Sequence, residues 1–112
     1  MIAIEPTTER AARVFLQRVA SRYDVTGAIL FGSRARGDHR SDSGADIAVL
    51  LAGEAGDFFD TQHALSDIAY DVLLDTEIRI QALPIWQAEW EHPERYSNPY
   101  LLRNVRREGV PL

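Results

Sequence analysis

A short turn that combines glycine, serine and arginine is the first segment whose residue types suit ligand binding. Gly32 and Ser33 directly follow an apolar run, and Arg34 and Arg36 come next. Glycine lets the backbone approach a ligand closely, and a serine hydroxyl together with the free N–H groups that open a helix donates hydrogen bonds to an anion. Guanidinium groups add permanent charge that suits phosphate oxygens. The turn is therefore predicted to bind a polyphosphate, although the chain has no lysine with which to build a Walker A loop.

Two carboxylates are candidates for a metal site beside this turn. Asp46 is predicted on one face of a second apolar run, whose Ile47 and Val49 point to the other face. Glu77 opens an alternating segment and would supply another ligand if the two strands are neighbours. Carboxylates from separate strands, together with phosphate oxygens, would make a Mg²⁺ site for phosphoryl transfer. Glu77 is equally well explained as a surface charge, for example as the partner of Arg79.

Hydrophobic periodicity predicts the helices and strands around these candidate residues. Apolar residues at helical spacing predict helices, and short apolar runs or strict alternation predict strands. Alternation in the last strand predicts that one sheet face is exposed to water. The order predicts an α/β (α+β) fold in one domain over residues 1–112, with a small mixed sheet and helices packed on one face. The predicted helices span residues 8–23, 33–36, 58–74, 85–91 and 100–107, and the predicted strands span 25–31, 45–51 and 77–83.

Composition excludes several classes of function. The chain has no cysteine, which removes thiol nucleophiles and zinc–thiolate sites. Seventeen acidic residues outnumber twelve arginines, for a net charge of −5, so we expect no direct contact with nucleic acid. The sequence contains no apolar run of about 18 residues and does not open with a signal peptide, so we expect a cytoplasmic protein without a membrane contact.

The spacing of the two site segments resembles a known family. Gly32–Ser33, then ten residues, then positions 44 and 46 followed by the run IAVLL resembles the nucleotidyltransferase superfamily that includes DNA polymerase beta, and in particular its minimal nucleotidyltransferase branch. The resemblance covers nearly the whole chain and implies the nucleotidyltransferase fold. It implies that Gly32 and Ser33 hold nucleotide phosphates, that Asp46 is the second aspartate of a magnesium-binding pair, and that a third carboxylate, for which Glu77 is the candidate, orients the acceptor hydroxyl.

The first aspartate of that pair is missing. Gly44 stands at its position, so the chain reads Gly-Ala-Asp where the family has Asp-x-Asp, and one metal ligand is absent. Asp42 would lie about 6.6 Å further along an extended chain, at ~3.3 Å per residue. That is far beyond a magnesium–oxygen bond of roughly 2.0–2.1 Å. We therefore expect nucleotide transfer by this chain to be weak or absent.

The resemblance extends to one kind of biological role. The chain resembles the antitoxin of HEPN/MNT toxin–antitoxin pairs, which implies a HEPN-type ribonuclease toxin as partner and transfer of AMP from Mg²⁺-bound ATP to a tyrosine of that toxin. One alternative is a catalytically impaired antitoxin that acts by binding its toxin. Another is the subunit of a small-molecule (antibiotic) nucleotidyltransferase. Assembly as a homo-oligomer or as a hetero-oligomer with the toxin stays open.

The C-terminal third carries residues with plainer interpretations. Trp86, Trp90 and Tyr96 are expected to pack this segment onto the domain rather than to form a base-stacking platform. Three arginines of the last helix are expected to complement the negative end of its dipole. The histidines have no spacing typical of a metal site.

Overall fold

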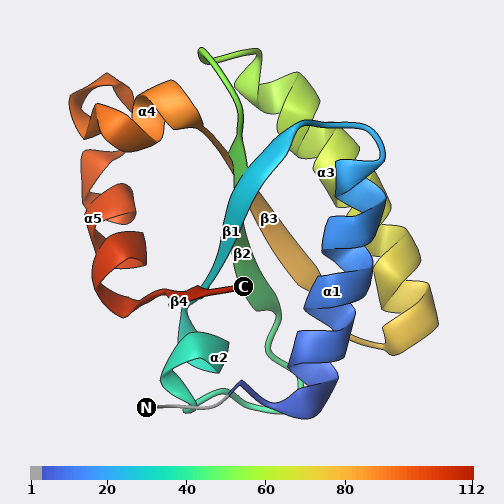
Figure 1. Ribbon diagram of the computed structural model, residues 1–112. Coiled ribbons are helices and arrows are strands. Elements are labelled where there is room, and N and C mark those ends of the chain that lie inside the picture. The colour runs from blue at the N-terminus through green and yellow to red at the C-terminus, as the bar shows by residue number, and fades with distance from the viewer. Residues whose placement is uncertain (1–3) are drawn as a thin grey trace.

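Over the residues that the structure describes, helices and strands alternate as far as β3, and α4 and α5 then follow one another before the last strand (Figure 1). The structure, a computed structural model, describes residues 4–112. The helices are α1 (Pro6–Ala20), α2 (Ser33–Arg36), α3 (Phe58–Thr76), α4 (Gln87–Glu91) and α5 (Pro99–Glu108), with a 3₁₀ turn at Pro93–Arg95. The strands are β1 (Val25–Phe31), β2 (Ala45–Leu51), β3 (Ile80–Trp86) and β4 (Val110–Pro111). None of the helices in this described range combines the length and apolar character needed to cross a membrane.

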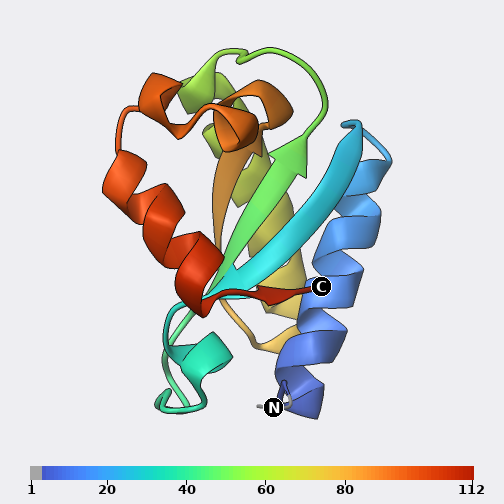
Figure 2. The same ribbon diagram turned by 60° about the vertical axis from the view of Figure 1, so that its left-hand side comes forward.

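The strands form one mixed sheet in the order β3-β2-β1-β4. β1 pairs antiparallel with β2 and, on its other side, with the short β4, while β2 and β3 are parallel and are joined through α3. Figure 2 shows β4 crossing beside β1 at one edge of the sheet. The mixed sheet and the mixed α/β class agree with the prediction, and strands 25–31 and 45–51 are confirmed at the predicted bounds.

The larger part of the core lies between one sheet face and the helices α1 and α3. Apolar residues on one side of each helix meet alternate residues of the strands, as the periodicity predicts. Phe15 of α1, Leu65 of α3 and Ile47 of β2 are fully buried there. Packing of α1 and α3 on this face holds the strands in place, so the residues on the opposite sheet face have defined positions.

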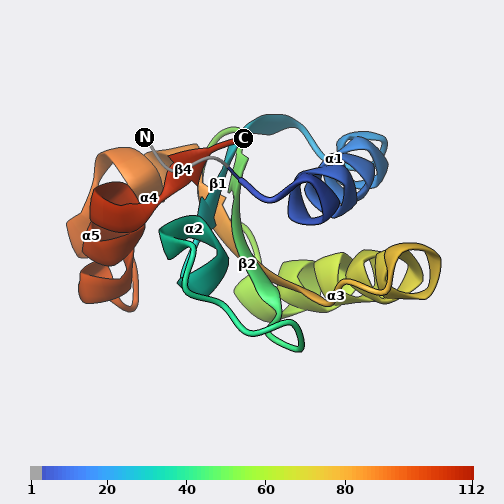
Figure 3. The same cartoon turned by 90° about the horizontal axis from the view of Figure 1, so that it is seen from below.

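The second sheet face is not exposed along its whole length, which corrects the prediction that helices pack on one face only. Figure 3 shows α1 and α3 on one side of the sheet and α4 and α5 on the other. Ala48 and Leu50 of β2 and Ile85 of β3 form a second buried cluster with Leu102 and Val105 of α5. The reason is visible in β2, whose residues after Asp46 are apolar at both odd and even positions, a pattern typical of a strand buried on both faces.

The third long strand begins later than predicted. β3 starts at Ile80 rather than at Glu77, because α3 continues to Thr76. Glu77 ends that helix in the left-handed conformation, with φ 63°, and its N–H donates to the carbonyl of Leu73 over 2.8 Å. The alternation that predicted a strand from residue 77 therefore belongs partly to a helix end.

The aromatic residues of the C-terminal third pack the chain onto the sheet, as predicted. Trp86 and Tyr96 are buried, and the Arg106 guanidinium carbon lies 3.7 Å from the centroid of the Trp90 ring. Burial raises the pKa of Tyr96 to about 12. Tyr96 and Trp90 pack on the second sheet face, whereas Trp86, at the end of β3, is part of the core on the first face.

Candidate functional site

The predicted turn and the predicted aspartate meet at the uncovered end of the second sheet face. Phe31, the last residue of β1, is paired with Asp46 near the start of β2, and Asp46 is paired in turn with Gln81 of β3. Side chains at 46 and 81 share the face on which Ala48 and Ile85 lie, because alternate strand residues point the same way. α2 begins immediately after β1 at this end, below the sheet in Figure 1.

Gly32 and Asp46 are in direct contact. Gly32 has φ 74° and ψ −157°, a backbone conformation that residues with a Cβ rarely adopt. A Cβ at this position would lie 2.3 Å from Oδ2 of Asp46, so the carboxylate packs against the bare backbone of the turn. The structure thus brings together two of the predicted site residues, which come from different elements, and Ser33 follows half-exposed at the start of α2.

The environment of Asp46 opposes its ionisation in part. The side chain is half-buried, and this burial raises the pKa of its carboxyl above the ordinary value for aspartate. The positive charges of Arg36 and Arg79 act in the opposite direction and lower the same pKa. Two guanidinium groups therefore influence one carboxylate.

Arg34 has a structural position that differs from its predicted role. Only 5% of the residue is exposed. Its Nε and Nη2 donate to the carbonyl of Ser43 over 3.0 and 2.7 Å, and its Nη1 donates to the Thr8 hydroxyl over 2.8 Å. The guanidinium thus ties the loop before β2 to α1. Because most of its N–H donors are used inside the protein, the structure gives no support for Arg34 as a phosphate ligand.

Arg36 is exposed and bridges two elements. Its Nε lies 3.3 Å from Asp38, and its Nη1 lies 3.4 Å from Glu108 at the end of α5. Both carboxylates raise the pKa of the Arg36 guanidinium, with Asp38 making the larger contribution. Arg36 is close enough to Asp46 for its charge to be felt there, so it remains the arginine of the predicted pair that borders the site.

The position of the missing aspartate is bordered by an arginine that sequence reasoning did not place in the site. A Cβ on Gly44 would lie 3.3 Å from Nε of Arg79 and 3.5 Å from Cδ of Gln81. The chain is held there by a hydrogen bond of 2.8 Å from the Ala45 N–H to the Arg79 carbonyl. Asp42, the other acidic residue considered for this role, is exposed in the turn that precedes Gly44.

The remaining predicted carboxylate lies outside the strand register of Asp46. Glu77 is exposed at the end of α3, before β3 begins, and the residue beside Asp46 on β3 is the neutral Gln81. Across residues 4–112, no group of three or more histidine and acidic side chains is arranged to hold a metal ion. The three neighbouring positions carry one carboxylate, Asp46, together with Gly44 and the amide Gln81. The site therefore does not fit a magnesium ion held by several carboxylates.

His39 is a second side chain, besides Arg34, that attaches the loop between α2 and β2 to the region of α1. Nε2 of His39 lies 2.9 Å from the Glu5 carboxylate just before α1, and its Nδ1 is buried without a hydrogen-bond partner among the residues described. The pKa of Glu5 is lowered, first by the hydrogen bond from Thr7 and then by the one from His39. The segment between α2 and β2 is thereby attached to α1 at two points.

Comparisons with known proteins support the family and the fold. A family model described as a nucleotidyltransferase domain matches residues 12–110. A search of curated proteins found no significant match. Among solved structures, a "putative nucleotidyltransferase" from Sulfolobus solfataricus is 21% identical with a TM-score of 0.62, over 94% of this chain and 81% of that one.

Two further structures share the fold. A "putative minimal nucleotidyltransferase" is 27% identical with a TM-score of 0.56 and covers 99% of this chain and 97% of its own. A toxin–antitoxin structure with AMP-PNP is 18% identical with a TM-score of 0.63, over 92% of this chain and 70% of that one. The family match spans nearly all of the chain and includes every residue of the candidate site. This chain belongs to the nucleotidyltransferase domain family.

Proposed function

We propose that this chain is a nucleotide-binding, antitoxin-type member of its family that acts mainly by binding a partner protein and transfers AMP weakly or not at all. The observation that carries the proposal is the contact between Gly32 and Asp46 beside a position, Gly44, that supplies no carboxylate. The first half of that observation supports nucleotide binding at the turn. The second half removes a metal ligand that the family uses for transfer.

The nucleotide in this proposal is ATP, with its phosphates on the Gly32–Ser33 turn. The Ser33 hydroxyl donates a hydrogen bond to a phosphate oxygen. Arg36 contributes charge at the border of the site. Arg34 acts as a positioning residue, because its hydrogen bonds hold the loop that leads into β2 and thus hold Gly44 and Asp46 in place.

The partner in this proposal is a HEPN-type ribonuclease toxin, bound in a hetero-oligomer in the cytoplasm. Support comes from the toxin–antitoxin structure with AMP-PNP, whose fold this chain shares. The exposed apolar side chains of α3, Phe59 at 79% and Leu74 at 65% exposure, offer apolar surface to such a partner.

AMP transfer to a tyrosine of the toxin is the second candidate, and the family match favours it. In that reaction the tyrosine oxygen attacks the α-phosphorus, the bond to pyrophosphate breaks, and the tyrosine proton leaves to a base. Asp46 packs against the turn and Gly44 supplies no carboxylate beside it, so Asp46 would have to act without the aspartate partner that the family supplies.

Calorimetric titration with ATP tests the nucleotide site. Ser33→Ala is expected to weaken ATP binding about fivefold, because one neutral hydrogen bond contributes roughly 1 kcal/mol. Ser66→Ala on the exposed side of α3 is the matched control and is expected to bind ATP like the unchanged protein. No ATP binding by the unchanged protein would contradict the proposal.

Co-purification and label transfer separate the two candidates. We expect the product of a neighbouring HEPN gene to co-purify with this chain, and we expect no radiolabel on that protein after incubation with α-labelled ATP and Mg²⁺. Stoichiometric labelling of the partner by the unchanged chain would establish the transferase and reject the impaired antitoxin.

A further inference from the structure

Arg79 borders the position at which the family has a metal-binding aspartate and this chain has Gly44. The residue immediately precedes β3, and its carbonyl accepts the hydrogen bond from Ala45 that opens the β2–β3 ladder. Gly44 is therefore directly beside Arg79 across the two strands. Nε of Arg79 is 3.3 Å from the place where a Cβ of residue 44 would be, so the base of the guanidinium borders the space that an aspartate side chain would need.

The charge of Arg79 is uncompensated by any ion pair within residues 4–112, whereas Arg36 has two acidic partners. The field of Arg79 nevertheless reaches Asp46, because it lowers the pKa of that carboxyl. The side chain is exposed, so its remaining N–H donors are open to a ligand. The nearest strand neighbour on the same face, Gln81, adds an amide and no charge.

This arrangement favours an anion over a divalent cation. A magnesium ion would meet a single carboxylate and would be repelled by two guanidinium groups, and it loses its hydration shell reluctantly. A phosphate group would meet a guanidinium that is always charged and presents paired N–H donors matched to phosphate oxygens. The preference of the site for phosphate over magnesium arises from Gly44 and Arg79 together.

We propose that Arg79 neutralises the phosphates of a bound nucleoside triphosphate in place of a divalent cation, so that this site binds the nucleotide as the metal-free anion. This inference rests on the proposed nucleotide site at the Gly32–Ser33 turn and identifies the form in which the nucleotide binds. It predicts that binding does not require magnesium.

Calorimetric titration with ATP in EDTA and in excess Mg²⁺ tests the inference. We expect binding in EDTA that is at least as tight as binding in Mg²⁺, because complexed ATP offers less negative charge to Arg79. Binding that is tenfold or more tighter in Mg²⁺ overturns the inference and leaves the proposed nucleotide site intact. The absence of ATP binding under both conditions overturns the proposed site and the inference with it.

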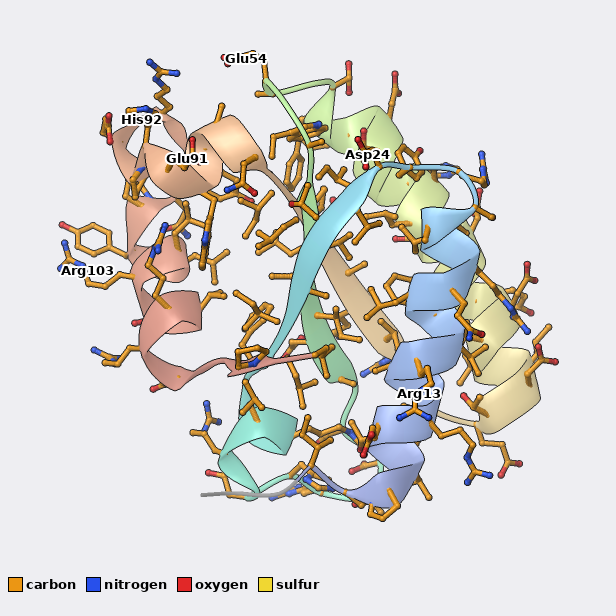
Figure 4. All side chains as sticks on the ribbon, in the orientation of Figure 1. Arg13, Asp24, Glu54, Glu91, His92 and Arg103 are labelled. Carbon is orange, nitrogen blue, oxygen red and sulfur yellow. The ribbon has the colours of Figure 1, made fainter. Side chains whose placement is uncertain are left out.

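A variant of the arginine makes the test specific. Arg79→Gln is expected to weaken ATP binding in EDTA at least tenfold, since a charged hydrogen-bond partner contributes roughly 1.5 kcal/mol or more. Arg103→Gln is the matched control, because Arg103 points away from the sheet on α5 (Figure 4). Circular dichroism verifies that both variants are folded. Equal ATP affinity in the Arg79→Gln variant and the control overturns the inference.

Direct binding of Mn²⁺, followed by electron paramagnetic resonance, provides a readout that needs no nucleotide. At about 100 µM Mn²⁺, a concentration suited to detecting a weak carboxylate site, we expect no binding by the unchanged chain. We also expect no binding by the Gly44→Asp variant, because its new carboxylate pairs with Arg79. The double variant Gly44→Asp, Arg79→Ala is expected to gain Mn²⁺ binding. If the double variant binds no better than Gly44→Asp alone, Arg79 does not stand in for the cation and the inference is overturned.

Discussion

The two sides of the candidate site differ in how far the fold itself depends on their residues. On the side of the turn, Gly32 has a left-handed backbone that a side chain would strain, and Arg34 is buried in hydrogen bonds to the loop before β2. On the side of β2 and β3, Gly44 and Arg79 lie just outside the strands with partly open surroundings. Residue types at the turn are therefore set by folding as well as by a ligand, while those at the strand ends can change the chemistry without changing the fold.

Replacing Arg34 tests the structural side of this comparison and has the largest expected effect. Arg34→Leu leaves the Ser43 carbonyl and the Thr8 hydroxyl without their buried donor, so the free energy of unfolding is expected to fall by about 3 kcal/mol. Urea denaturation measures this loss. Arg13→Ala, which removes an exposed pair with Glu9, is the control and is expected to cost less than about 0.5 kcal/mol.

The opposite outcome would assign Arg34 a role in ligand binding instead of in folding. If Arg34→Leu unfolds like the unchanged protein and instead abolishes ATP binding, Arg34 is a phosphate ligand and its hydrogen bonds in the structure contribute little.

Gly32→Ala measures the contact between the turn and Asp46. The new methyl group meets both an unfavourable φ and the Asp46 carboxylate, so a loss of about 2 kcal/mol is expected in urea denaturation. Gly53→Ala is the matched control, because Gly53 has φ 86° with no atom near its Cβ position, and it is expected to cost about 1 kcal/mol from backbone strain alone.

A double-mutant cycle isolates the steric part of that loss. In an Asp46→Ala background, Gly32→Ala should cost no more than Gly53→Ala does, because the clashing carboxylate is gone. An undiminished cost in that background would show that the carboxylate and the turn do not press on each other.

The pH dependence of stability gives a smaller effect at the same carboxylate. Because burial raises the folded-state pKa of Asp46, the folded protein holds this proton to a higher pH than the unfolded chain, and stability is lost as pH rises through the folded-state pKa. Asp46→Asn lacks this loss. Its stability relative to the unchanged protein should therefore rise between pH 3 and pH 7 (roughly the range around an ordinary aspartate pKa), by less than about 1 kcal/mol, since solvent screens a half-buried group.

Glu108→Gln is expected to have the smallest effect on stability. It removes one exposed partner of Arg36 and should shift the unfolding midpoint by less than about 2 °C in a thermal melt. Freeing Arg36 should also strengthen ATP binding slightly at low salt. A weakened affinity would indicate that α5 must hold Arg36 in place for the site to form.

The predicted site residues that the structure brings together, Gly32 and Asp46, are those defined by local spacing. Gly32 and Asp46 are separated by α2 and the loop that follows it, and the apolar runs around them predict two strands whose bounds are confirmed. Their contact follows once those strands pair. The family resemblance also identifies Gly32 and Asp46, because it rests on the same local segment of sequence.

The parts that were missed depend on direction and register, which spacing alone does not contain. The first turn of α2 points Arg34 inward to Thr8, although its neighbour Arg36 is exposed, and a helix this short shows no periodicity from which to predict that. Arg79 reaches Gly44 only because Ala45 pairs with Ile80 in a parallel register. The local sequence suggests Arg79 only as a surface partner of Glu77, since nothing local links it to residue 44.

The two outer strands of the sheet have a consequence for how this protein meets others. β3 carries Pro84 and β4 ends in Pro111, and these strands form the two edges of the sheet. Proline has no backbone N–H, and it is one of the residues by which natural proteins keep an edge strand from pairing with another chain. Growth of the sheet by addition of a foreign strand is therefore discouraged at both edges, so molecular recognition by this chain is left to its helices and loops.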